Sequence, residues 1–390
     1  MSATDLAGLL RDRSLLVCVG PGGVGKTTVA AALGLQAARM GRKTLVLTID
    51  PARRLAAMLG LDGLDDAARS VPLDGVDARA GGRLDAAMLD TGASYDALIH
   101  RIAADPDHRA RILGNRLYRV MSRSFGAAHA YVAMERLHDA LQAGDHDLVV
   151  LDTPPTRNAL DILDAPGRLA AFLDDGVVRW FVRDPAGGLR GRLFARGGAA
   201  ATRLLGKLAG AGLVAEMGEF FEAFMSLRAG FQARAEQVQR ALRADDSAFV
   251  LVSSALGPNL ADARFLHDGL VGRGISVRAA VFNRAYTILG ADRREVVTEA
   301  PPRAAMHAAD LAAHIDVDAT TRRALAGLDA LRAAAAADNL AGQRAIAELT
   351  RLLDRTCLKV QAPIFERELQ DLPALARLGD DLCAAPFAPY

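Results

Sequence analysis

The stretch that decides the fold reads Gly20-Pro21-Gly22-Gly23-Val24-Gly25-Lys26-Thr27. A short apolar run, residues 15–19, precedes it, and residues 27–40 follow with alanines and leucines at helical spacing. A second apolar run occupies residues 44–48, just after Gly41. This order predicts a buried strand, a glycine turn, a helix that stops at a glycine, and a second buried strand. Such a unit is the βαβ element of a parallel sheet.

Further apolar runs predict more strands of the same sheet, at residues 147–151, 249–253, 277–282 and 359–365, with a last helix at 372–382. Strands that alternate with helices in this way are typical of α/β proteins. The predicted fold class is therefore α/β, with a doubly wound and mostly parallel sheet of the P-loop NTPase kind.

Two long intervals, at about residues 95–143 and 160–242, contain no strand signal. Both are rich in alanine, leucine and arginine at helical spacing, and the second also concentrates phenylalanine. We interpret them as insertions that form a helical subdomain within one P-loop domain of residues 1–390.

The glycine loop fits the pattern GxxxxGK[ST], in the strand and helix context that this pattern requires. The backbone N–H groups of such a loop surround phosphate oxygens, and the helix N-terminus favours their charge. A glycine turn with a chance lysine is the alternative, although the chain has few lysines. The expected nucleotide-binding residues are Gly20, Gly22, Gly23, Val24, Gly25, Lys26, Thr27 and Thr28. Lys26 would reach the β- and γ-phosphates, and the Thr27 hydroxyl would bind Mg²⁺.

Two aspartates each end a strand candidate. Asp152 follows the run 147–151 and is placed to hold Mg²⁺ through water, together with Thr27. Asp50 follows the other run and could orient an attacking water as a catalytic residue beside Lys26. Either aspartate could instead form a turn or cap the next helix, and both alternatives stay open.

Length, charge and hydropathy exclude several classes of protein. The chain has 390 residues, 51% of them hydrophobic, and a formal net charge of +1, which excludes extensive disorder and gives no global attraction to nucleic acid. No apolar stretch approaches the roughly 18 residues of a membrane helix, so we expect no stable membrane insertion. The three cysteines show no zinc or disulfide spacing. We expect a cytoplasmic protein.

Together, the loop, the segment Thr48-Ile49-Asp50-Pro51-Ala52 and the segment Asp152-Thr153-Pro154-Pro155-Thr156 resemble the ATPases of the arsenite-pump and tail-anchored-protein-targeting family. The similarity extends to residues 134–137, 161–169 and 365–378. It implies ATP and Mg²⁺ as cofactors, Asp50 as the residue that polarises water, and Asn283 as a contact to adenine. Asn283 could equally be a turn residue. The absence of an NKxD motif favours ATP over GTP.

Three departures from that family limit what it implies. Pro21 stands where the wider class has a lysine that reaches a partner's phosphates, and proline supplies no charge. The zinc-bridging CxxC and the arsenite-binding cysteines are absent. We therefore carry over neither metalloid transport nor a zinc-bridged dimer, and a homodimer or a heterodimer with a related ATPase stays open.

A last candidate site is an apolar set in the second interval: Met217, Phe220, Phe221, Phe224, Met225 and Phe231. It could line a groove for a protein or peptide cargo, or it could be ordinary core. Our prediction is a Mg²⁺-dependent ATPase whose switch loops rearrange the helical subdomain to bind or hand over such cargo. The alternative is a regulatory ATP-binding subunit that hydrolyses weakly and acts with a related partner. A small-molecule kinase is disfavoured because the sequence lacks a lid-like arginine cluster.

Overall fold

The computed structural model describes residues 5–49, 54–89, 96, 99–100, 103, 105–115, 118, 126–155, 159–165, 228–254, 259–285, 318–365 and 368–384. These residues build a sheet of eight strands in the order β3-β4-β2-β5-β1-β6-β7-β8. All neighbouring strands are parallel except β3 and β4. The strands are β1 Leu15–Val19, β2 Lys43–Thr48, β3 Arg69–Val71, β4 Arg83–Met88, β5 Leu148–Asp152, β6 Ser247–Ser254, β7 Val277–Ala285 and β8 Leu358–Pro363.

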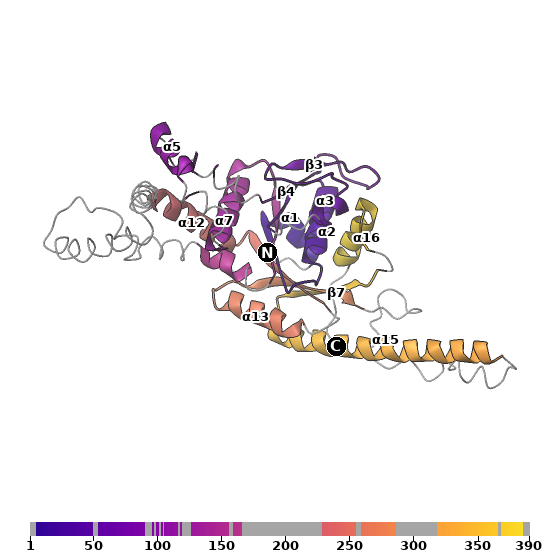
Figure 1. Ribbon diagram of the computed structural model, residues 1–390. Helices are drawn as coiled ribbons and strands as arrows, with labels where there is room; N and C mark the ends of the chain where they lie inside the picture. The colour runs from indigo at the N-terminus through magenta and orange to yellow at the C-terminus, as the bar shows by residue number, and fades with distance from the viewer. Residues whose placement is uncertain are drawn as a thin grey trace, which may run out of the picture.

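Helices cover both faces of the sheet (Figure 1). One face carries α1 Leu6–Asp12, α2 Lys26–Arg39, α3 Arg54–Met58 and α16 Leu372–Cys383. The other face carries α7 Gly126–Ala143, α12 Arg228–Arg243, α13 Leu260–Val271 and the C-terminal end of α15 Ala319–Leu352. A shorter helix, α5 Pro106–Gly114, lies beyond α12 and α7. The predicted doubly wound α/β fold is confirmed.

The central strands are apolar on both sides because both sides face a core. In β1, Leu15 and Val17 contribute to the core under α7 and α12, whereas Leu16 and Cys18 contribute to the core under α2 and α16. All five residues of β1 are buried. This explains why the strand appears in the sequence as a continuous apolar run rather than as an alternating one.

Strands β3 and β4 are not predicted from the sequence, because the charged residues Arg69, Arg83 and Asp85 interrupt their apolar pattern. Within β4, Asp85 is 6% exposed, which is unusual for a carboxylate in a strand. It is satisfied by Arg83, whose Nε lies 2.8 Å from Asp85 Oδ2, and by His146, whose Nε2 lies at the same distance from that oxygen. These partners come from the strand's start and from a loop 61 residues away, so the sequence pattern alone does not reveal a buried strand.

The two predicted helical insertions fall only in part on described residues. There, α5, α7, α12 and residues 159–165 are helical, and α7 and α12 pack in the same core as the strands. The apolar set from Met217 to Phe231 lies outside the described side chains, so its role as a groove or a core stays a prediction. The long helix α15 projects past the sheet (Figure 1). Within the described ranges, no helix has both the length and the apolar character that a membrane span requires.

Candidate functional site

The glycine loop leaves β1 at the carboxyl edge of the sheet and passes directly against β6. A Cβ on Gly20 would lie 2.1 Å from the Val252 carbonyl oxygen, so the backbone approach excludes any side chain there. Gly25 has a φ of +88° and forms the N-cap of α2. That left-handed conformation lets the chain turn from the loop into the helix at little cost only for glycine.

Helix α2 begins at the loop with its first turn open. Its N-cap is Gly25, which has no side chain that could cap the backbone N–H groups of that turn. Lys26 opens the helix and is 7% exposed. Its ammonium Nζ donates a hydrogen bond of 2.8 Å to the Pro21 carbonyl oxygen. The lysine therefore bends back over the loop, with its charge at the place where phosphate is expected.

Asp152 lies where the carboxyl ends of β5, β1 and β2 are side by side. It ends β5, is 0% exposed, and pairs in register with Cys18 of β1 and Thr48 of β2. Its Oδ2 accepts hydrogen bonds from Thr27 Oγ1 at 2.7 Å and from Thr48 Oγ1 at 2.9 Å. Thr27 and Asp152, the two predicted metal ligands, are thus in direct contact, and their binding of Mg²⁺ stays a prediction.

This buried carboxylate also affects a neighbouring thiol. Burial raises the pKa of Cys18 far above its ordinary value, the charge of Asp152 raises it further, and the ammonium of Lys26 lowers it. Desolvation and the carboxylate outweigh the lysine. Cys18 therefore stays a protonated core residue beneath the loop.

Asn283 lies near the end of β7 and is turned toward the loop. Its Nδ2 donates a 2.8 Å hydrogen bond to the Val24 carbonyl oxygen, and its Oδ1 accepts one of 3.0 Å from the Arg284 backbone N–H. Arg284 has a φ of +57°, a conformation that arginine seldom adopts. In this geometry Asn283 positions the glycine loop, and its predicted contact to adenine stays a prediction.

Some predicted residues are placed differently or lie outside the described ranges. The Thr28 hydroxyl lies 3.7 Å from the Met58 sulfur of α3, a weak acceptor, and its predicted contact to phosphate stays a prediction. Asp50 and Arg53 are outside the described residues, and the exposed Arg54 begins α3. Thr48, which the sequence analysis did not select, shares Asp152 with Thr27. Its position at the end of a strand, like that of Asp152, was the signal available.

A Mg²⁺-nucleotide fits these residues on the chemistry that they offer. A buried carboxylate and a threonine hydroxyl, 2.7 Å apart, form the all-oxygen donor pair that Mg²⁺ prefers. The uncapped helix start and the left-handed glycines Gly23 and Gly25 form a backbone cradle for an anion. Among the described residues, no heavy atom lies within 4 Å of a Cβ built on Gly23, so these residues leave space beside the loop there.

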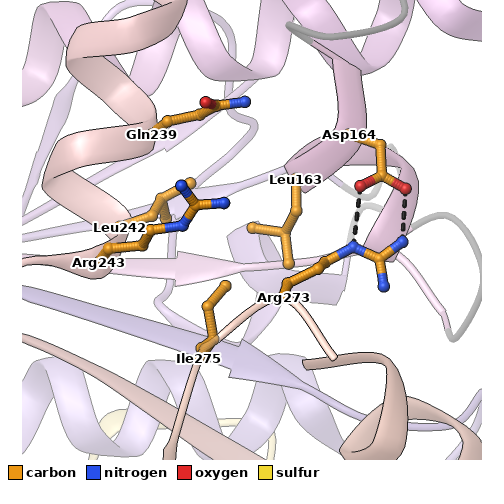
Figure 2. A pocket seen from close by; sticks show the side chains of 7 residues that line it. All are labelled: Leu163, Asp164, Gln239, Leu242, Arg243, Arg273 and Ile275. Carbon is orange, nitrogen blue, oxygen red and sulfur yellow. Dashed lines mark hydrogen bonds and ion pairs between the residues drawn. The ribbon is translucent and has the colours of Figure 1, made fainter. Parts of the chain in front are cut away.

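A second hollow, of about 360 Å³, lies away from this loop. Figure 2 shows Arg273 on its wall, paired with Asp164, and Ile275 on its floor. Arg273 Nε and Nη2 donate hydrogen bonds of 2.8 and 2.5 Å to the two oxygens of Asp164. Ile275 comes just before β7, so this cavity lies at the amino edge of the sheet. The glycine loop lies at the carboxyl edge, and the cavity is thus not the nucleotide site.

Residues 13–179 match the sequence profile of the family described as anion-transporting ATPase, ArsA_ATPase. This part of the chain is ArsA-like. The ArsA-like segment holds the glycine loop, Asp50, Asp152 and helix α7. Asn283 and residues 365–378 lie beyond it, so the resemblance predicted for them stays a prediction.

Individual relatives agree with the ArsA-like assignment. An uncharacterized protein of Streptomyces coelicolor is 38% identical over 167 residues, which cover 41% of this chain and 39% of that protein. The arsenical pump-driving ATPase of Escherichia coli is 24% identical over 161 residues, covering 41% of this chain and 27% of that protein. A Mycobacterium tuberculosis protein is 29% identical over 163 residues, which cover 40% of this chain and 38% of that protein. The chain thus spans well under half the length of these relatives.

Proposed function

We propose that this chain is a Mg²⁺-dependent ATPase in which the loop from Gly20 to Thr28 holds the nucleotide phosphates. The observation that carries the proposal is the convergence of Lys26, Thr27 and Asp152 at the carboxyl edge of β1 and β5. The ArsA-like segment that contains all three residues supports it, since the matched family is one of ATPases.

The bound Mg²⁺-nucleotide would supply the phosphoanhydride bond and a divalent charge that neutralises the phosphates. The chain's own residues would do the rest. Lys26 would exchange its hydrogen bond to the Pro21 carbonyl for one to phosphate, because a charged acceptor binds an ammonium more strongly than a neutral carbonyl does. The Thr27 hydroxyl and Asp152 would supply the oxygens for the metal.

The segment after Asp152 is held at both ends, which makes it suited to pass on a change at the nucleotide. At its start, Thr153 Oγ1 donates a 2.8 Å hydrogen bond to the Cys18 carbonyl oxygen. Farther on, Leu160 packs tightly on Gly269 of α13, and Asp164 is clamped by Arg273. We propose that movement at Asp152 is transmitted through this segment to α13.

Pro21 decides how the transition-state charge is stabilised. Its carbonyl accepts from Lys26, but the residue itself offers no cation to a partner's phosphates. A local arginine, Arg53 or Arg54, could supply that charge. The second candidate function follows from the same observation: a regulatory subunit that binds ATP, hydrolyses it weakly and depends on a related partner that carries the lysine.

The cargo part of the proposal rests on the sequence alone. If the set from Met217 to Phe231 is a groove for a protein or peptide, ATP and ADP should give different amide exchange between residues 180 and 231. Identical protection in both states would favour core packing.

Product analysis of the purified chain with Mg-ATP tests the enzyme proposal. We expect free phosphate at a specific activity independent of protein concentration, falling when Arg53 or Arg54 is changed to Ala. Unchanged ATP that is turned over only on mixing with a related ATPase would support the regulatory subunit instead. A phosphorylated acceptor would contradict both and indicate a kinase.

A further inference from the structure

A second polar cluster joins α7 to α12 on the sheet face opposite α2. Glu135, His138 and Asp139 lie on one side of α7, because residues three and four apart share a helix face. Each offers one ligand atom, and these atoms lie within 4.8 Å of one another. Glu135 is 3% exposed and His138 is 7% exposed, whereas Asp139 is partly exposed, so the cluster is buried on the side of Glu135 and His138.

The histidine carries the observation that points to a cation. His138 Nε2 lies 2.6 Å from Gln237 Oε1 on α12. An amide oxygen only accepts, so Nε2 carries a proton, and Nδ1 is the ring nitrogen that has a lone pair when the ring carries one proton. Nδ1 is buried without a hydrogen-bond partner and lies 3.8 Å from Asp139 Oδ1. Two acceptors that face each other away from water repel unless a positive charge lies between them.

Arg234 of α12 is the cation at the carboxylates in this structure. Its Nε lies 2.5 Å from Glu135 Oε2, and its Nη2 lies 2.8 Å from Asp139 Oδ1. Arg234 therefore bridges the carboxylates of Glu135 and Asp139, while His138 Nδ1 takes no part in this bridge. A smaller, doubly charged ion could contact all three groups at once.

We propose that Glu135, His138 and Asp139 bind a divalent transition-metal ion of the Zn²⁺ class, in exchange for the Arg234 guanidinium. One imidazole nitrogen and two carboxylates are ligands that such ions accept, with bonds of about 2.0–2.2 Å. Gln237 would hold the other ring nitrogen, as partners of metal-bound histidines commonly do. An imidazole ligand separates this site from the all-oxygen pair at Thr27 and Asp152, which suits Mg²⁺.

Exchange of the Arg234 guanidinium for a metal ion would change how α12 is attached to α7. Arg234 is the tie from α12 to both carboxylates of α7. When the metal takes the carboxylates, that tie is released, and the contact from Gln237 of α12 to His138 remains. Metal binding would thereby alter the side-chain contacts between α7 and α12.

The test is a calorimetric titration of the chelator-stripped full chain with ZnCl₂, in excess Mg²⁺ so that the nucleotide site is not counted. We expect one strong zinc site per chain, and His138→Gln should weaken it at least tenfold. His146→Gln is the matched control: the His146 side chain is 8% exposed and its Nε2 lies 2.8 Å from Asp85 Oδ2, but among the described residues no third metal-ligating side chain joins this pair. Its zinc affinity should equal that of the wild type.

A second variant distinguishes exchange from simple addition. Arg234→Gln removes the resident cation and should strengthen zinc binding at least tenfold. If that variant is unstable without metal, zinc should raise its melting temperature more than it raises that of the wild type. The proposal is overturned if the wild type binds no stoichiometric zinc, if His138→Gln binds as tightly as the wild type, or if Arg234→Gln gains neither affinity nor stability from zinc.

Discussion

Thr27 and Asp152 are 125 residues apart in the sequence, yet Thr27 Oγ1 donates a hydrogen bond of 2.7 Å to Asp152 Oδ2. Parallel strands make this possible, because β1 and β5 both end at the edge where the loop begins. Thr48, at the end of β2, donates to the same oxygen at 2.9 Å. The Asp152 carboxylate thus accepts hydrogen bonds from two hydroxyls that belong to two different segments.

Thr48→Val should destabilise the protein, because a buried charged acceptor loses one of its donors. The expected loss in the free energy of unfolding is about 1–3 kcal/mol, measured by urea denaturation. Thr44→Val is the control: Thr44 is a buried residue of the same strand, and its hydroxyl makes a long contact of 3.5 Å to the Arg42 carbonyl oxygen. Equal losses in the two variants would show that the bond to Asp152 contributes little.

Gly20→Ala should damage both stability and nucleotide binding. The added Cβ would meet the backbone oxygen of Val252 at 2.1 Å, so the loop or β6 must shift. We expect a loss of about 1–3 kcal/mol in the free energy of unfolding, together with weaker ATP binding. Gly63→Ala serves as a control because no heavy atom lies within 4 Å of its added Cβ. A Gly20→Ala variant as stable as that control would contradict the close approach.

The sequence predicts the sheet and the loop well, because both have local signals. Apolar runs indicate the buried strands, and the glycine pattern before Lys26 indicates the loop. The sequence does not predict β4, because the buried Asp85 in that strand has its partner, His146, in a distant loop. It also gives no hint that Asn283 holds the Val24 carbonyl, since that contact depends on how β7 lies in the sheet. Contacts of this kind are set by strand order, which a single sequence does not encode locally.

Asp50→Asn should slow hydrolysis while leaving ATP binding intact. The amide keeps the size and polarity of the side chain but polarises water less than a carboxylate does. Phosphate release and ATP affinity are measured in parallel, with the exposed Asp62→Asn as a control on the same stretch of chain. Turnover at the wild-type rate would leave Asp50 a capping role.

Cys18 should be the slowest of the three cysteines to react with a thiol reagent in the folded protein. Burial raises its pKa most, above those of Cys357, raised to about 11, and Cys383, raised to about 12. The thiolate is the reactive form, so a raised pKa slows labelling. Mass spectrometry after timed alkylation gives the order. Labelling of Cys18 before the other two would contradict its place under the loop.

The same shift has a consequence for stability in alkaline solution. Above the ordinary thiol pKa of 9.0, the unfolded chain releases the Cys18 proton while the folded chain keeps it. The unfolded state then binds fewer protons, so the free energy of unfolding falls as pH rises through that range. In Cys18→Val this part of the pH dependence should be absent.

The most direct test of the central claim is a calorimetric titration of Mg-ATP into the wild type and into Lys26→Ala. Lys26 supplies the loop's positive charge, so its loss should weaken binding at least about tenfold, or ~1.4 kcal/mol. Lys43→Ala is the matched control, since Lys43 begins β2 at the opposite edge of the sheet and is exposed. The account predicts weaker binding in Lys26→Ala alone. Wild-type affinity in Lys26→Ala would contradict the assignment of this loop as the nucleotide site.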